Sequence, residues 1–265
     1  MNEQRTLTTD NNDIAYSVYG HGVPVVLLHG FAEDSRIWEH QVESLQQDYK
    51  LIVIDLPGSG DSSLLPNGSM ELYAEAVKNI INVESNEPVA LIGHSMGGYI
   101  TLAFADAYPE MLSGFCLFHS SAYADDEEKI NTRRKGIEFI KENGAERFLA
   151  QSIPNLFSEQ TRTEKPELIK EIVDRYANFS ADSLVQYYEA MIARPDRTKV
   201  LKKFEKPVLF IAGKHDNAVP MQKTLEQSTM PSFSYIHICN NSGHMGMLEE
   251  TESCNNALFH FLSAL

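Results

Sequence analysis

The sequence predicts an α/β fold built on a mostly parallel sheet. Short apolar runs rich in Val and Ile alternate with stretches of helical periodicity along the chain. Nearly continuous apolar strands are typical of a parallel sheet that is covered on both faces, and strand–helix alternation favours right-handed crossovers. With 265 residues, 43% of them hydrophobic, the chain is long enough for one large domain or for a domain with an insertion.

Six runs are predicted as strands because turn residues flank each of them. They cover residues 23–29, 50–55, 88–93, 114–119, 207–213 and 234–238. Helical patterns lie between them, for example around 70–83 and 98–107. The polar start of the chain, 3–18, could add an antiparallel hairpin at one edge of the sheet.

Residues 122–200 interrupt this alternation, because they contain no clear strand. Pro166 stands near the start of one predicted amphipathic helix, and Ser180 is a suitable N-cap for the next. Ordinary crossover helices are the alternative, but the segment is far longer than one crossover needs. We therefore predict a core of residues 1–121 and 201–265, with 122–200 inserted as a helical cap, or lid.

The composition excludes several classes of partner. The net charge of −15 disfavours nucleic acids and anionic lipid surfaces, because both are bound by clustered Lys and Arg. No apolar run reaches the roughly 18 residues of a membrane span. The N-terminus is polar, without the apolar stretch of a signal peptide, and the three cysteines do not form a disulfide framework. We expect a reduced, cytoplasmic protein with no membrane or nucleic-acid partner.

The stretch GHSMGG surrounds Ser95 with glycines at a predicted strand-to-helix turn. The spacing G-x-S-x-G in this context is typical of a nucleophile elbow, a sharp turn that exposes a serine hydroxyl above the sheet. Side chains at Gly93 and Gly97 would collide with the turn or with the packed strand and helix, and glycine removes the Cβ that would collide. We predict that Ser95 is a nucleophile.

A serine nucleophile needs a base, and the base needs a third group that orients it. After an elbow serine the expected order is an acid and then a histidine. Asp216, just past the strand 207–213, and His244, after the last strand, fit this order, although Asp216 could instead form a local turn. Other histidines compete less well: His215 adjoins the acid, His237 lies within a strand, and His119 follows the strand after the elbow, where it could approach the site.

The alternative position for the acid, after the strand 114–119, offers no carboxylate. Ser120 and Ser121 follow that strand directly. Asp125 and Asp126 come later and have the pattern of a solvated helix start. We therefore retain the acid after the strand 207–213.

An oxyanion that forms during attack by the serine needs two hydrogen-bond donors about 3 Å away. The backbone N–H of Met96, next to the nucleophile, is one candidate. The second is the N–H of Phe31, which follows the turn His29-Gly30 after an early strand. A simple strand-ending turn is the alternative interpretation of His29-Gly30.

At these residues the sequence resembles the α/β-hydrolase fold superfamily, most closely its small serine carboxylesterase and enol-lactonase-like branch. The resemblance covers nearly the whole chain and rests on LLHGF (27–31), DLPGSGDS (55–62), GHSMGG (93–98), GKHDNAVP (213–220) and SGHMGMLEE (242–250). It implies an eight-stranded, mostly parallel sheet with helices on both faces and a helical cap inserted after the sixth strand. It also implies a catalytic triad of Ser95, Asp216 and His244, an oxyanion hole at Phe31 and Met96, and no metal or organic cofactor.

The resemblance implies a serine hydrolase that cleaves a carboxylic ester or thioester of a small molecule. Two alternatives stay open: a small-molecule receptor or signalling protein with a slow triad, and a non-hydrolytic lyase on the same site. The menaquinone-pathway lyase has a similar elbow, but members of that branch usually have an arginine where this chain has Tyr99. The oligomeric state stays undetermined. Apolar side chains near the catalytic loops or in the cap are predicted to contact the substrate: Trp38, Tyr99, Tyr187, Met191, Val219 and Met245.

Overall fold

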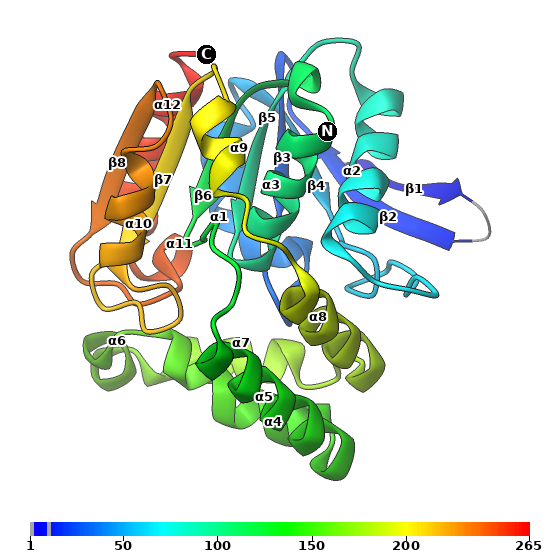
Figure 1. Cartoon of the computed structure of the whole chain (residues 1–265), viewed down its shortest axis with the longest axis vertical. Helices are drawn as coiled ribbons and strands as arrows, with labels where there is room; N and C mark the ends of the chain where they lie inside the picture. Colours follow the sequence, from blue (N-terminus) through cyan, green and yellow to red (C-terminus); the bar gives the residue numbers. More distant parts are fainter. Residues whose placement is uncertain (1–2, 10–11) are drawn as a thin grey trace.

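An eight-stranded sheet forms the centre of the computed structural model, which describes residues 3–9 and 12–265 (Figure 1). Its order is β1-β2-β4-β3-β5-β6-β7-β8. Strands β1 and β2, and β2 and β4, pair antiparallel, and all later neighbours pair parallel. The strands are β1 (Glu3–Thr9), β2 (Asn12–Tyr19), β3 (Val23–Leu28), β4 (Tyr49–Ile54), β5 (Val89–His94), β6 (Leu112–Phe118), β7 (Val208–Gly213) and β8 (Ser234–Cys239).

The predicted fold class is confirmed, and each of the six apolar runs lies within two residues of an observed strand. The polar start forms the predicted antiparallel pair of β1 and β2, and residues 10–11 between them lie outside the described residues. The apolar runs are continuous because both faces of the sheet are covered. Val26 and Leu28 of β3 enter one hydrophobic core, and Val25 and Leu27 enter the other.

Helices cover the two faces of the sheet. Residues of α2 (Met70–Glu84), α3 (Met96–Ala107) and α9 (Thr198–Lys203) belong to one core, and residues of α1 (Glu39–Leu45) and α12 (Thr251–Leu262) belong to the other. Shorter elements complete the layers: η1 (Ser35–Trp38), η2 (Pro109–Met111), α10 (Met221–Ser228) and α11 (Gly246–Glu249). No helix within 3–9 and 12–265 has the length and hydropathy that a membrane span requires.

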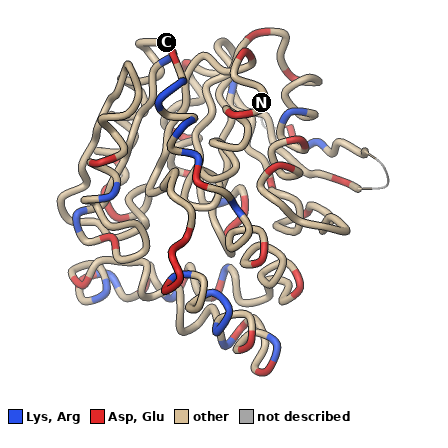
Figure 2. The backbone as a smooth tube through the Cα atoms, viewed as in Figure 1, with Lys and Arg blue, Asp and Glu red and all other residues tan. Residues whose placement is uncertain are grey.

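The chain between β6 and β7, all of it described, contains no strand. Its helices before α9 are α4 (Glu127–Asn143), α5 (Ala145–Ser152), η3 (Ile153–Leu156), α6 (Glu159–Glu164), α7 (Pro166–Tyr176) and α8 (Ala181–Ala193). Helices α4 to α8 lie together beyond one end of the sheet (Figure 1). Acidic and basic residues are interspersed along them (Figure 2). Helix α7 begins at Pro166 as predicted, and the Ser180 side chain caps α8 by accepting from the amide of Ser183.

The start of α4 corrects one prediction. Asp126 is the exposed N-cap of this helix, as expected, but Asp125 is not solvated. Its side chain is fully buried and accepts hydrogen bonds from Arg133 Nε at 2.6 Å and Arg194 Nη2 at 2.8 Å. Burial alone would raise the pKa of Asp125, but the two guanidinium groups lower it to about 2. Arg194 is remote in the sequence, so the local pattern around Asp125 could not reveal this ion-pair cluster.

Candidate active site

Ser95 is the single residue between β5 and α3, at the strand-to-helix turn that the elbow spacing predicts. Its backbone has φ 50° and ψ −112°, a conformation that L-residues rarely adopt and that costs about 1–3 kcal/mol. Hydrogen bonds from neighbouring elements hold it there. The Ser95 N–H donates to the carbonyl of Phe118 at 2.9 Å, and the Ser95 carbonyl accepts from Ser120 Oγ at 2.7 Å and from the Gly98 N–H at 3.0 Å.

The elbow packs so closely that three glycines have no room for a side chain. A Cβ on Gly93 would lie 2.4 Å from the backbone of Gly97, and one on Gly98 would lie 2.3 Å from Ser120 Oγ. A Cβ on Gly97 would lie 2.4 Å from the carbonyl oxygen of Leu28. These contacts are shorter than side chains tolerate, so the glycines allow α3 to approach the ends of β3 and β6.

We predict that Gly97→Ala lowers the free energy of unfolding by at least about 2 kcal/mol, because the new methyl group would collide with backbone that cannot move independently. Urea denaturation measures the loss. Gln222→Ala, at an exposed position of α10, is the control and should change the free energy of unfolding by no more than about 0.5 kcal/mol. Equal losses in the two variants would contradict the account of the elbow.

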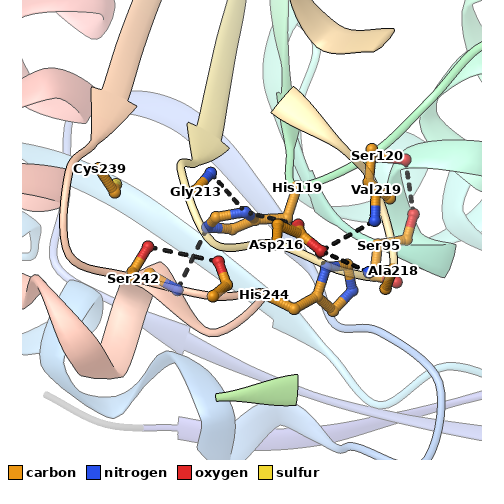
Figure 3. Close-up of polar contacts among 12 residues, drawn as sticks. Ser95, His119, Ser120, Gly213, Asp216, Ala218, Val219, Cys239, Ser242 and His244 are labelled. Atoms are coloured by element: carbon orange, nitrogen blue, oxygen red, sulfur yellow. Dashed lines mark hydrogen bonds and ion pairs between the residues drawn. The ribbon is translucent and has the colours of Figure 1, made fainter. Parts of the chain in front are cut away.

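Asp216 and His244 meet above the ends of β7 and β8 (Figure 3). His244 Nδ1 lies 2.8 Å from Asp216 Oδ2, and both side chains are almost fully buried. The other carboxylate oxygen, Oδ1, accepts from the amides of Ala218 and Val219, each at 2.8 Å. Asp216 therefore shapes its own loop with one oxygen and contacts His244 with the other. It can form a local turn and orient a histidine at the same time, so these two predicted roles are compatible.

The surroundings of this pair favour its charged form. Burial alone would raise the pKa of Asp216, but the imidazoles of His244 and His119 hold it below its usual range. Burial would lower the pKa of His244, but the Asp216 carboxylate outweighs this and raises it above the ordinary value. A histidine with Nδ1 held by a carboxylate presents Nε2 as the free nitrogen that can accept a proton.

A second buried carboxylate–histidine pair connects the loops that carry Ser95 and His244 to the loop after β3. Glu33 Oε2 accepts from the Gly30 N–H at 2.6 Å and lies 2.9 Å from His94 Nδ1. His94 Nε2 lies 3.0 Å from the backbone carbonyl of His244. The residue before Ser95 thus joins the loop after β3 to the loop that holds the histidine. The sequence interpretation missed Glu33, because only the HGF motif, which ends two residues earlier, marked its loop.

The two amides predicted to bind an oxyanion both lie beside the serine. In the stretches 3–9 and 12–265, neither the Phe31 N–H nor the Met96 N–H donates to a protein acceptor. The preceding turn is held by His29, whose Nδ1 lies 2.8 Å from the Gly30 carbonyl. A Cβ on Gly30 would lie 3.2 Å from Ser95 Cβ, so this loop runs directly past Ser95. Two free N–H groups here could stabilise a developing negative charge.

The residues predicted to contact the substrate fall into two groups. Tyr99, Met191, Val219 and Met245 are buried near the catalytic loops or in the overlying helices. Trp38 and Tyr187 are also fully buried, but protein partners account for their positions. Trp38 packs edge-on against Phe118 and His94, and the Tyr187 hydroxyl lies 2.7 Å from Ser59 Oγ.

The three histidines considered as alternatives to His244 lie in different places, and one of them reaches the site. His215 is exposed, and its amide donates to the Ser242 carbonyl. His237 lies within β8, where Nε2 is 3.0 Å from Ser253 Oγ. His119 does reach the site, because its Nδ1 lies 3.1 Å from Asp216 Oδ2.

Comparison with known proteins identifies the family. The alpha/beta hydrolase fold family matches residues 23–251. A putative 2-succinyl-6-hydroxy-2,4-cyclohexadiene-1-carboxylate synthase of Bacillus subtilis (strain 168) is 28% identical, over 97% of this chain and 98% of its own length. A pimeloyl-[acyl-carrier protein] methyl ester esterase of Xylella fastidiosa (strain M23) is 26% identical, over 94% and 98%. The solved structure of a thermophilic esterase from Thermogutta terrifontis superposes with a TM-score of 0.93 at 28% identity, over 99% of this chain and 98% of that one.

The chain therefore belongs to the alpha/beta hydrolase fold family, which confirms the family predicted from the sequence. Its relatives over nearly the full length include esterases, in agreement with the predicted branch.

Proposed function

We propose that the protein is a serine hydrolase that cleaves a carboxylic ester or thioester of a small molecule through an acyl-enzyme. The observation that supports this most strongly is the strained backbone of Ser95, held at φ 50° beside two amides that donate to no acceptor among the described residues. Figure 3 shows Ser95 on the same side of the sheet as the Asp216–His244 pair. Strain of this kind persists where the surrounding structure enforces it, often at active sites. The esterase relatives support the same class of substrate.

In the proposed reaction Ser95 Oγ attacks the acyl carbon while His244 Nε2 takes its proton. Asp216 holds Nδ1–H and stabilises the imidazolium that forms. The amides of Phe31 and Met96 receive the oxyanion. His244 then protonates the leaving alcohol or thiol, and afterwards it activates the water that releases the acid. Each step uses these residues, the substrate and water.

We also propose that the helices between β6 and β7 act as a lid that shapes an apolar acyl pocket. The Phe31 ring stacks on Tyr188 with centroids 4.3 Å apart and meets Phe148 edge-on at 6.2 Å. The backbone N–H of His244 donates to the carbonyl of Leu156, in η3, at 2.6 Å. Lid residues thus contact both the oxyanion loop and the base. A shaped pocket predicts rates that differ between p-nitrophenyl esters of short and medium acyl chains, and equal rates would contradict it.

The pH dependence follows from His244. The base must be neutral to accept a proton, and its pKa is raised above the ordinary value of about 6.5. We therefore expect kcat/KM to fall as the pH drops, with a midpoint above 6.5 in the free enzyme. A pH–rate series between pH 5 and 9 measures it, and a rate that stays flat from pH 8 to 5 would exclude His244 as the base.

A non-hydrolytic lyase is the second candidate, because the Bacillus subtilis relative is a putative synthase similar over its full length. A lyase would release a small acid without incorporating water. Mass spectrometry of products formed in H₂¹⁸O separates the two functions: ester hydrolysis places one ¹⁸O in the acid, and a lyase places none. A receptor with a slow triad would show neither product at an appreciable rate.

A fluorophosphonate probe tests the proposed function directly, because it labels only activated serines. We expect stoichiometric labelling of the wild type and turnover of at least one p-nitrophenyl ester. Absence of labelling would overturn the proposal.

A further inference from the structure

His119 is a buried histidine that the proposed mechanism does not use. It follows β6, it is completely inaccessible to solvent, and its backbone has φ 49°, one of only a few non-glycine residues with positive φ in 3–9 and 12–265. Its amide donates to the Ile211 carbonyl at 2.8 Å, which ends the pairing of β6 with β7 and turns the side chain toward Asp216. A strained and fully buried imidazole at the end of the strand next to the elbow suggests a role in the site.

The contacts of the ring determine which nitrogen carries its proton. Nε2 lies 3.2 Å from the backbone nitrogen of Gly246, which can only donate, so Nε2 must accept. Nδ1 then carries the proton and points at Asp216 Oδ2, 3.1 Å away. The Gly213 N–H also approaches Nδ1 at 3.2 Å, but the opposite tautomer would leave both the Oδ2 contact and the Gly246 amide unsatisfied. The neutral Nδ1–H tautomer satisfies two of the three neighbours, and the alternative satisfies one.

Asp216 Oδ2 consequently accepts two imidazole N–H groups, from His244 at 2.8 Å and from His119 at 3.1 Å (Figure 3). We propose that His119 is a positioning residue for the acid: its Nδ1–H fixes the Asp216 carboxylate and shares the negative charge that would otherwise act on His244 alone. The part of this inference that concerns the pH profile rests on the proposed hydrolase function.

A second hydrogen bond to the Asp216 carboxylate is expected to lower the pKa of His244. An imidazolium on His244 is stabilised by the negative charge on Oδ2, and a second donor on that oxygen weakens the stabilisation. His119 therefore keeps His244 neutral, and able to accept a proton, to lower pH than the carboxylate alone would allow.

Other titratable groups also face these residues and stay constant in the test. His94 and Glu33, from the loops after β5 and β3, and Lys129 of α4 act on His244. Cys239, at the end of β8, faces His119. None of them donates to Asp216 Oδ2, so a change confined to His119 isolates the shared hydrogen bond.

Two substitutions separate positioning from packing. His119→Phe keeps a buried ring but removes the donor, and His119→Gln supplies a donor for Asp216 and an acceptor for Gly246. We expect the acid midpoint of kcat/KM to rise by about one pH unit in H119F, with roughly tenfold lower activity at pH 6 beyond any loss on the alkaline plateau. The midpoint in H119Q should stay at the wild-type value. A lower plateau with an unchanged midpoint in H119F would show a structural role only and overturn the proposal.

A measurement on the unaltered protein tests the same hydrogen bond without relying on turnover, and H119Q serves only to assign the signal. Histidine labelled with ¹⁵N allows two-bond proton–nitrogen correlation spectra to distinguish the tautomers, and the signal that disappears in H119Q is assigned to His119. We expect a neutral Nδ1–H ring. An Nε2–H ring would overturn the proposal even in an active hydrolase. An Nδ1–H ring in a protein that hydrolyses no ester would support the hydrogen bond while the proposed function failed.

Discussion

Ser95→Ala is expected to lower kcat for ester hydrolysis by about 10⁴-fold or more, and to abolish labelling by a fluorophosphonate. The hydroxyl is the only group of the elbow that can form the acyl-enzyme. The residual rate would come from the oxyanion donors and from substrate binding alone. Steady-state kinetics and gel-based labelling of the purified variant measure the two effects.

The variant should fold normally, because the backbone contacts of Ser95 involve its N–H and its carbonyl. Its melting temperature should therefore match that of the wild type. Ser263→Ala, at the exposed end of α12, is the matched control and should retain full activity. An active S95A variant would contradict the assignment of the nucleophile.

Asp216→Asn is the second large effect that we expect, a loss of about 10⁴-fold in kcat. The amide oxygen can still accept from Ala218 and Val219, so the loop should keep its shape. The amide NH₂ would then face His244 Nδ1 and donate to it, which places the remaining imidazole proton on Nε2. A base protonated at Nε2 cannot take the proton of Ser95.

The expected result is loss of turnover at every pH near neutrality, with little change in substrate KM. Asp174→Asn serves as the control, because Asp174 is exposed and pairs with Lys170 on the same helix. Retention of more than about a tenth of the wild-type kcat in D216N would mean that the carboxylate does not orient the base.

The sequence predicted those parts of the site that depend on local pattern. Six of the eight strands are apolar runs, and Ser95, Asp216 and His244 each follow one of them, so parallel pairing alone brings their loops to one edge of the sheet. Glu33 and His119 were harder to assign, because their roles depend on partners that are far away along the chain. Glu33 contacts His94 across 61 positions, and His119 contacts Asp216 across 97.

The same limit explains the incorrect prediction for Asp125. Charged residues before a helix are usually solvated, and only the fold brings Arg194 to this carboxylate. The helices between β6 and β7 pose a similar problem, since amphipathic periodicity identifies the buried face of a helix but not what that face covers. The stacking of Tyr188 on Phe31 could be seen only in the structure.

Trapping of the covalent intermediate tests the central claim most directly. The wild type is mixed with a p-nitrophenyl ester, quenched with acid within milliseconds, digested and analysed by peptide mass spectrometry. The account predicts an acyl group on Ser95 that appears with a burst of p-nitrophenol and is absent from S95A. Turnover of the ester with no acyl group on Ser95, or with the acyl group on another residue, would contradict it.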